Sequence, residues 1–108
     1  ADKEIVDPHD AWADDETLAV GVESFQGVIN VPIDRMLSNW AGLRSFAPDG
    51  NLVIGPDKNS PSFFWFAGQG GYGFQTAAAA SQLLSDLFLE RTVSVEREIL
   101  EALLPSRF

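Results

Sequence analysis

The feature that most constrains the fold is a cluster of four glycines within six residues. The cluster follows an apolar run at 62–67, precedes an alanine- and leucine-rich segment at 76–90, and comprises Gly68, Gly70, Gly71 and Gly73. A continuous apolar run bounded by turn residues predicts a strand buried on both faces, and the broad apolar stripe of 76–90 predicts a helix. The sequence therefore predicts a strand, a glycine-rich loop and a helix in direct succession.

Such a unit can serve as a ligand site. Glycine has no Cβ, so a ligand can approach the backbone, and the first turn of a helix presents unpaired N–H groups that favour an anion or a carbonyl oxygen. A dinucleotide pyrophosphate is a weak candidate, because its fingerprint requires an acidic residue about 20 residues further on, at a strand end. Glu90 falls instead in the tail of the predicted helix. From the loop alone, a ligand site and a tight turn without a ligand stay equally open.

A further helix is predicted on the amino-terminal side. Apolar residues recur at helical spacing from Leu18 to Ile29. Asp14 or Asp15 can cap the first turn, where carboxylates suit the helix dipole, and Pro32 ends the helix.

Between these helices the pattern indicates β-structure. The apolar segment 38–46 and the short segment 52–54 flank the turn sequence Pro-Asp-Gly-Asn at 48–51, which predicts a hairpin. A short helix at 95–104, ended by Pro105, closes the chain. The expected class is α+β: a hairpin and a buried strand leading through the glycine loop into a long helix, flanked by an amino-terminal helix and a short carboxy-terminal helix.

Composition excludes several functions. The formal net charge is −9 and the pI is about 4.2, which argues against a nucleic-acid partner because phosphate binding needs a basic surface. No apolar run approaches the length of a membrane span. There are no cysteines, so thiolate chemistry, disulfides and flavin attachment through cysteine are excluded. The acidic residues 14–16 point in different directions on a helix, so no metal site is expected, and His9 is expected to be solvated.

Arg44 is the one basic residue between Arg35 and Lys58, and it lies in an apolar segment. Its guanidinium can form a salt bridge with a nearby acid, or it can bind a ligand carboxylate through two parallel hydrogen bonds. Local reasoning slightly favours a salt bridge, or a simple position at the sheet surface, over a ligand contact. Three other arginines are expected to be ordinary surface charges: Arg91, Arg97 and Arg107.

The ordered motifs together resemble a known family. They are Trp-Ala-Gly-Leu-Arg-Ser-Phe at 40–46, Pro-Asp-Gly at 48–50, Val-Ile-Gly-Pro at 53–56 and Phe-Ala-Gly-Gln-Gly-Gly-Tyr-Gly-Phe-Gln-Thr-Ala at 66–77. This set resembles the carboxy-terminal end of the D-amino-acid oxidase superfamily, and within it the D-amino-acid dehydrogenases, including the D-arginine type, and glycine oxidase. The resemblance is firm over 40–88 and loose over 1–37.

The resemblance implies a role for each matching residue. Arg44 would bind the carboxylate of an amino-acid substrate, Gln75 would line the substrate pocket, and the carbonyl of Gly71 could accept a hydrogen bond from the substrate amine. The opening N–H groups of the helix would face the flavin N1 and C2 carbonyl. The implied flavin-contacting residues are Gly42, Gly70, Gly71, Tyr72, Gly73, Phe74, Gln75 and Thr76.

The resemblance also implies an organisation and a reaction. Residues 1–37 would come from the substrate-domain side and 38–108 from the flavin side, with the FAD-binding Rossmann part of the same protein outside this sequence. The whole enzyme would oxidise an α-amino acid with noncovalent FAD. This piece alone is expected to be inactive, to hold FAD weakly or not at all, and to expose apolar surface through which it could form a homodimer.

Several alternatives stay open. One is a non-enzymatic interaction domain that uses the aromatic run at 63–66, and another is one subunit of an amine oxidase whose site is split between chains. The expected compartment is the cytoplasm, with a peripheral membrane location also allowed. Substrate side chain, stereochemistry and the choice between oxygen and quinone as electron acceptor are left undetermined.

Overall fold

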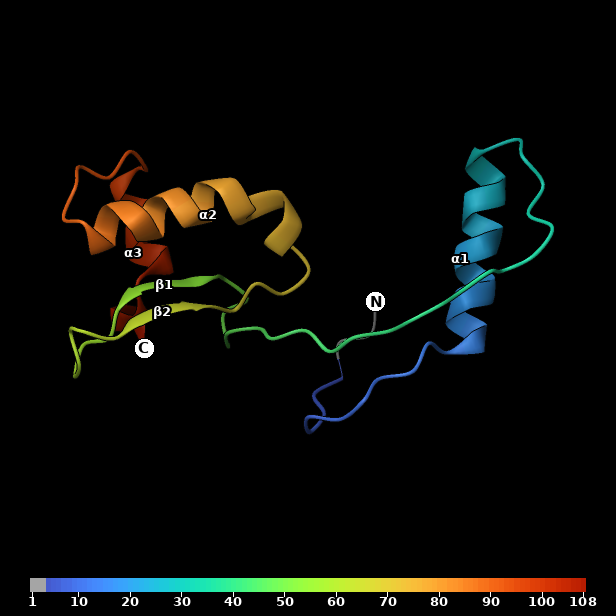
Figure 1. Ribbon diagram of the computed structural model, residues 1–108, viewed down its shortest axis with the longest axis horizontal. Coiled ribbons are helices and arrows are strands. Elements are labelled where there is room, and N and C mark those ends of the chain that lie inside the picture. Colours follow the sequence, from blue (N-terminus) through green and yellow to red (C-terminus); the bar gives the residue numbers. More distant parts are fainter. Residues whose placement is uncertain (1–3) are drawn as a thin grey trace. The chain divides into compact units, whose positions relative to one another are not determined.

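The computed structural model describes residues 4–108 and divides the chain into two units, with the boundary between Leu43 and Arg44 (Figure 1). Within residues 4–43, the described part of the first unit, there is one helix, α1 (Asp15–Val28). The second contains a two-stranded sheet and the remaining helices. The predicted α+β class is confirmed, and each unit is described by itself below.

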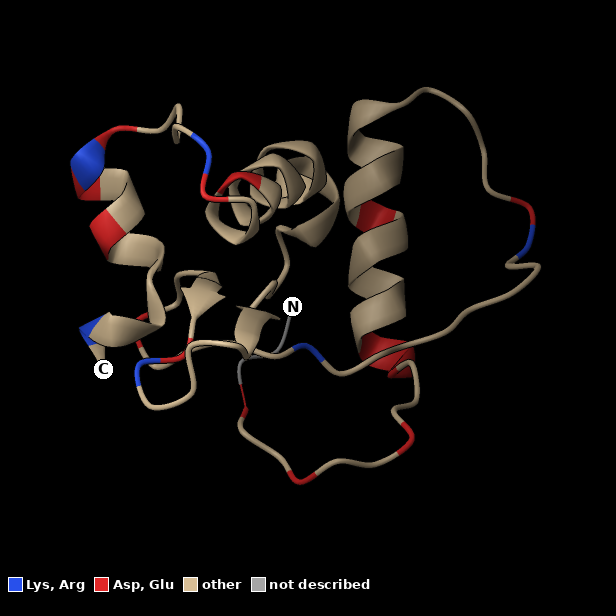
Figure 2. Ribbon diagram, turned by 60° about the vertical axis from the view of Figure 1, so that its left-hand side comes forward, with Lys and Arg blue, Asp and Glu red and all other residues tan. Residues whose placement is uncertain are grey.

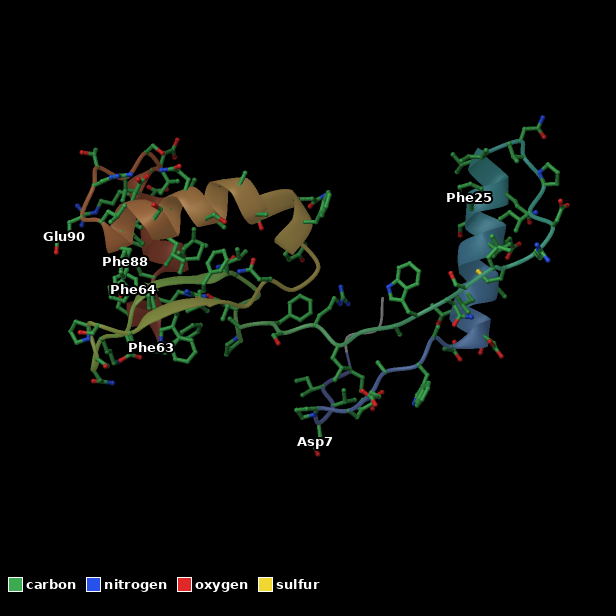
Figure 3. The ribbon with its side chains drawn as sticks, in the orientation of Figure 1. Asp7, Phe25, Phe63, Phe64, Phe88 and Glu90 are labelled. Atoms are coloured by element: carbon green, nitrogen blue, oxygen red, sulfur yellow. The ribbon has the colours of Figure 1, made fainter. Side chains whose placement is uncertain are left out.

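Helix α1 is formed by local signals. The Asp14 carboxylate accepts a hydrogen bond of 2.7 Å from the N–H of Thr17, which caps the first turn as expected. The helix ends where Ile29 adopts an extended conformation, ahead of Pro32. None of the described residues 4–43 is buried, and Phe25 on this helix is 46% exposed (Figure 3). The helix therefore forms without a core of its own.

The strand pairing differs from the prediction. Strand β1 (Val53–Pro56) pairs antiparallel with β2 (Phe64–Ala67), in the register Ile54 opposite Phe66. The segment 38–46 is not a strand, so the hairpin predicted between it and 52–54 is wrong. The turn at 48–51 does form, with Gly50 N–H donating to the Ala47 carbonyl at 2.9 Å. The residues before that turn contact the glycine loop instead of pairing with β1.

The loop between the two strands explains this choice of partner. The Asp57 carboxylate accepts hydrogen bonds from the N–H groups of Asn59 and Ser60, and the Asp57 N–H donates to the Phe63 carbonyl at 2.8 Å. The same carboxylate accepts from the Trp65 indole at 3.0 Å. This network closes a short connection and brings the apolar run at 64–67 against β1.

One face of the hairpin carries the buried core. Helix α2 (Gly73–Phe88) packs on β1, and the buried core consists of Ile54, Ala80 and Leu83. Phe64 meets Phe88 of α2 edge to face at 5.2 Å between ring centroids, whereas Phe63 pairs with Trp65 at 5.1 Å (Figure 3). The prediction that 62–67 is buried on both faces is wrong. Trp65 and Phe66 keep 39% and 42% of their surface exposed, because α2 packs mainly on β1 and not on β2.

Helix α2 ends in a left-handed turn. Glu90 has a φ of +53°, and the N–H of Arg91 donates to the Asp86 carbonyl at 2.8 Å. In helix ends of this type the left-handed position is usually occupied by glycine. The chain then returns through α3 (Arg97–Leu103) and the 3₁₀ helix η1 (Pro105–Arg107), both of which contact β1. The two predicted helices at 76–90 and 95–104 are thus confirmed, with shifted ends.

One arginine differs from expectation. The Arg107 side chain is only 12% exposed and forms an ion pair with Asp49 at 2.6 Å, so its prediction as an ordinary surface charge is wrong. Arg97, in contrast, is 87% exposed and pairs with Glu101 one helical turn away.

Candidate functional site

The glycine loop joins β2 to α2 and folds back on the chain that precedes β1. Gly68 and Gly70 have φ values of +70° and +51°, which favour glycine, and the N–H of Gly70 donates to the Ser45 carbonyl at 2.9 Å. The N–H of Tyr72 donates to the Gln69 carbonyl at 2.9 Å and closes the turn that leads into α2. The sequence segments around residues 45 and 70 are therefore neighbours in space.

The side chains of Arg44 and Phe46 lie against two of these glycines. A Cβ built on Gly70 would stand 2.5 Å from the Phe46 ring, and one on Gly71 would stand 2.8 Å from Arg44 Nη1. The Arg44 guanidinium carbon is also 5.2 Å from the centroid of the Phe46 ring, a cation–π distance. The absence of a Cβ at both positions thus leaves space for the Phe46 ring and the end of the Arg44 side chain beside the loop.

The start of α2 is open. Its N-cap residue, Tyr72, makes no side-chain capping bond, and the first turn carries no acidic residue (Figure 2). The N–H of Thr76 donates a hydrogen bond to the Tyr72 carbonyl at 3.0 Å, and the Thr76 hydroxyl donates to the same oxygen at 2.9 Å. The earlier N–H groups of the turn, at Phe74 and Gln75, are the ones that a helix of this kind leaves for an anion or a carbonyl oxygen.

The structure brings most of the predicted residues into one neighbourhood. Arg44, Gly70 and Gly71 are in contact, and the predicted residues from Tyr72 to Thr76 form the adjoining turn and the opening of α2. Gln75 and Phe74 are exposed. Phe74 is 101% exposed, so none of the described residues covers its side chain. Gly42 falls in the first unit, where a Cβ would meet nothing within 4 Å of the described atoms. Its predicted flavin contact stays a prediction.

Sequence reasoning missed three contributors. Phe46 fills the space beside Gly70 and contacts the Arg44 guanidinium. Its position two residues after the arginine could have indicated this contact. The Ser45 carbonyl anchors the loop, and no side-chain pattern could have indicated it. Gln69 packs its Cβ at 3.3 Å from where a Gly73 Cβ would lie, and its amide nitrogen is buried without a hydrogen-bond partner in the described residues.

Perturbed acids lie outside this neighbourhood. The Arg107 guanidinium lowers the pKa of Asp49 from 3.8 to about 2, and the hydrogen bond from the Trp65 indole lowers the pKa of Asp57. Among residues 4–108 there is no group of three or more histidine or carboxylate side chains arranged to hold a metal ion. None of the helices in that range is both long and apolar enough to cross a bilayer.

Comparison with known proteins assigns the chain to a family. Residues 2–87 match the family described as DAO, FAD dependent oxidoreductase. The chain belongs to this family of FAD-dependent oxidoreductases. A curated relative, the D-amino acid dehydrogenase of Sinorhizobium medicae (strain WSM419), is 32% identical over 59 residues. That match covers 55% of this chain and 14% of the dehydrogenase, so the chain spans a small part of this relative's length.

Proposed function

We propose that this chain is the carboxy-terminal, flavin-side part of an FAD-dependent oxidoreductase that oxidises the C–N bond of an α-amino acid, most simply a D-amino acid or glycine. The observation that carries the proposal is the contact of Arg44 with the glycine turn that opens α2. It places a fixed positive charge beside backbone that is free of side chains, next to a helix start without a cap. The family membership and the name of the relative support the same reaction class.

In this proposal Arg44 binds the substrate α-carboxylate. A guanidinium presents two parallel N–H donors that match a carboxylate, and hydrogen bonds of this charged kind contribute about 1.5–3 kcal/mol each. The Phe46 ring below the guanidinium limits the directions it can take. An amino acid held in this way keeps its α-carbon near the loop, where the Gly71 carbonyl can accept from the amine and Gln75 can contact the side chain.

The residues present fit one edge of a flavin. The glycines at 70 and 71 leave no Cβ to block a flat ring, and the uncapped start of α2 offers N–H donors where an electron-rich ring edge would carry negative charge. FAD, when bound, would accept a hydride from the α-carbon with the two electrons of its C–H bond, while the amine loses a proton and the C–N single bond becomes C=N. This chain has no cysteine for covalent attachment, so the cofactor would be held noncovalently. The ADP half of the cofactor would be bound by the FAD-binding Rossmann part of the same protein, which lies outside this sequence.

Exposed aromatic surface supports a second role for the hairpin. Phe63, Phe66 and Phe88 are 52%, 42% and 63% exposed, so large aromatic side chains of the hairpin and of α2 stay uncovered by the described residues. In the enzyme this surface would be covered by the remainder of the flavoprotein. In the alternative, a non-enzymatic domain would use it for self-association. Sedimentation of the 108-residue chain, alone and with the flavin-binding part of a DAO protein, distinguishes the two roles. A yellow complex of the two polypeptides supports the enzyme. A colourless homodimer that does not bind the flavin-binding part supports the alternative.

The role of Arg44 is tested with Arg44→Lys in the complete flavoprotein. We expect the KM for an amino acid to rise roughly 10- to 100-fold, because one ammonium cannot replace the two-pronged contact. The matched control is Arg97→Lys, an exposed arginine paired on its own helix, which should change nothing.

The decarboxylated amine of the same substrate provides the decisive comparison. It lacks the group that Arg44 would bind, so its turnover should be equally slow in both proteins. An equal loss of activity toward the amino acid and the amine would remove Arg44 from the carboxylate site.

A further inference from the structure

Arg107, near the carboxy-terminal end of the second unit, joins two separate pieces of backbone. Its Nε and Nη2 donate to the two Asp49 oxygens at 2.6 and 3.1 Å, and Nη2 also reaches the Asn51 carbonyl at 3.3 Å. Its Nη1 donates to the carbonyls of Leu103 and Leu104 at 2.9 and 3.1 Å. One guanidinium therefore ties the end of α3 to the turn at 48–51.

That turn supports the glycine loop. A Cβ built on Gly68 would stand 3.2 Å from the Asn51 carbonyl oxygen and 3.5 Å from the Ala47 nitrogen, so the turn backbone lies directly against the loop backbone. The Asn51 carbonyl is thus shared: it accepts from Arg107 and faces Gly68. On the other side of the turn, the Ser45 carbonyl accepts from the N–H of Gly70.

We infer that Arg107 is a positioning residue, which holds the 47–51 turn against Gly68 and thereby fixes the loop at Gly70 and Gly71 together with the neighbouring Arg44. The guanidinium is suited to this because it can donate in several directions from one plane, whereas a lysine ammonium in the same place cannot reach both the turn and the α3 carbonyls. The lowered pKa of Asp49 agrees with a tight ion pair at the centre of this contact.

The competing explanation is that Arg107 only fastens the carboxy-terminal segment. The two differ in where a defect would appear. A fastening role confines the defect to α3, η1 and Phe108. A positioning role carries the defect to the N–H of Gly70, which is bonded to the Ser45 carbonyl and makes no contact with Arg107 itself.

The experiment is Arg107→Lys in the 108-residue chain, with Arg97→Lys as the matched control. Amide hydrogen exchange of Gly70 is compared with that of the β1 and β2 amides, and the Nε–H resonance of Arg44 is followed in the same samples. We expect exchange at Gly70 to rise roughly tenfold relative to the strands, as for loss of one charge-assisted hydrogen bond, and the Arg44 resonance to shift. Unchanged Gly70 exchange with faster exchange only at the carboxy-terminal end would overturn the inference.

A second variant, Asp49→Asn, covers the case in which Arg107→Lys unfolds the unit. It weakens the ion pair and keeps one oxygen to accept from Arg107. Selective exchange at Gly70 in this variant supports the positioning role. An equal rise at Gly70 and in both strands of the Asp49→Asn protein contradicts it, because the ion pair would then stabilise the whole unit. The measurement needs neither flavin nor turnover, so this inference and the proposed function can fail independently.

Discussion

Helices α1 and α2 have similar lengths, 14 and 16 residues, but they are stabilised in opposite ways. Helix α1 has an aspartate cap, acidic residues in its first turn and no buried residue. Helix α2 has no side-chain cap and no acidic residue in its first turn, but it buries Ala80, Leu83 and Asp86. Isolated helices of this length are marginal in water, so each helix needs one of these two supports.

This difference explains why, of the two helices, α2 is the one whose first N–H groups are available to a ligand. An aspartate side chain at Asp14 already occupies the first N–H groups of α1 and would repel an anion. Packing against the hairpin at Ala80 and Leu83 stabilises α2, so its opening turn can stay uncapped without loss of the helix. A binding site at a helix start thus depends on a core placed elsewhere on the same helix.

The largest expected effect separates the two regions by their cores. Ile54 is 1% exposed beneath α2, so Ile54→Ala should lower the free energy of unfolding of residues 44–108 by about 2–5 kcal/mol. The control is Val28→Ala on α1, where the side chain is 87% exposed and little should change. Urea titration followed by amide NMR signals reads the two units separately. Loss of α1 signals together with those of α2 in the Ile54 variant would show a single cooperative unit and break the comparison.

The next effect compares two glycines. Gly68 combines a φ of +70° with backbone atoms at 3.2 Å from a built Cβ, so Gly68→Ala should destabilise residues 44–108 by about 1–2 kcal/mol. Gly42→Ala, in the first unit, meets nothing within 4 Å among the described atoms and should leave both units unchanged. The same urea titration measures both. Equal tolerance at the two positions would mean that the loop can move away from the 47–51 turn.

These contrasts also show what the sequence could predict. Helix α1 was predictable because its cap, its spacing and its terminator are all encoded within a few residues of one another. The position of α2 and of the glycine loop was predictable for the same reason. The hairpin was not, because 38–46 and 64–67 are both apolar and compete for β1. The outcome is decided by the Asp57 network and by the contact of 44–46 with the loop.

The site was predictable to a similar extent. Arg44 and the glycines were indicated by residue type and by the family resemblance, and the structure places them in contact. Arg107 was not indicated, since an arginine near a chain end, far from Asp49 in sequence, looks like any surface charge. Long-range ion pairs of this kind depend on how α3 returns to the sheet, which no local pattern encodes.

The smallest expected effect is an acid response specific to each region. Hydrogen bonds from Thr17 lower the pKa of Asp14, and Arg107 lowers that of Asp49 from 3.8 to about 2. A carboxylate with a lowered pKa in the folded state contributes stability above its ordinary pKa and loses it as the pH falls toward the folded value. For Asp49 the loss should occur between about pH 4 and pH 2. Each region should therefore weaken in acid through its own aspartate.

Two neutral variants separate the responses. Asp14→Asn keeps a good capping side chain and removes the charge, so the α1 amide shifts should become less dependent on pH while those of 44–108 titrate as before. Asp49→Asn should do the reverse, with a residual dependence from Asp57, whose pKa is also lowered. Amide shifts recorded through an acid titration of the three proteins provide the measurement. If either variant reduced the pH dependence of the amide shifts in both regions, the two regions would not be independent. Removing a charge from one region would then have changed the acid response of the other, and the local support of α1 could not be separated from the tertiary support of α2.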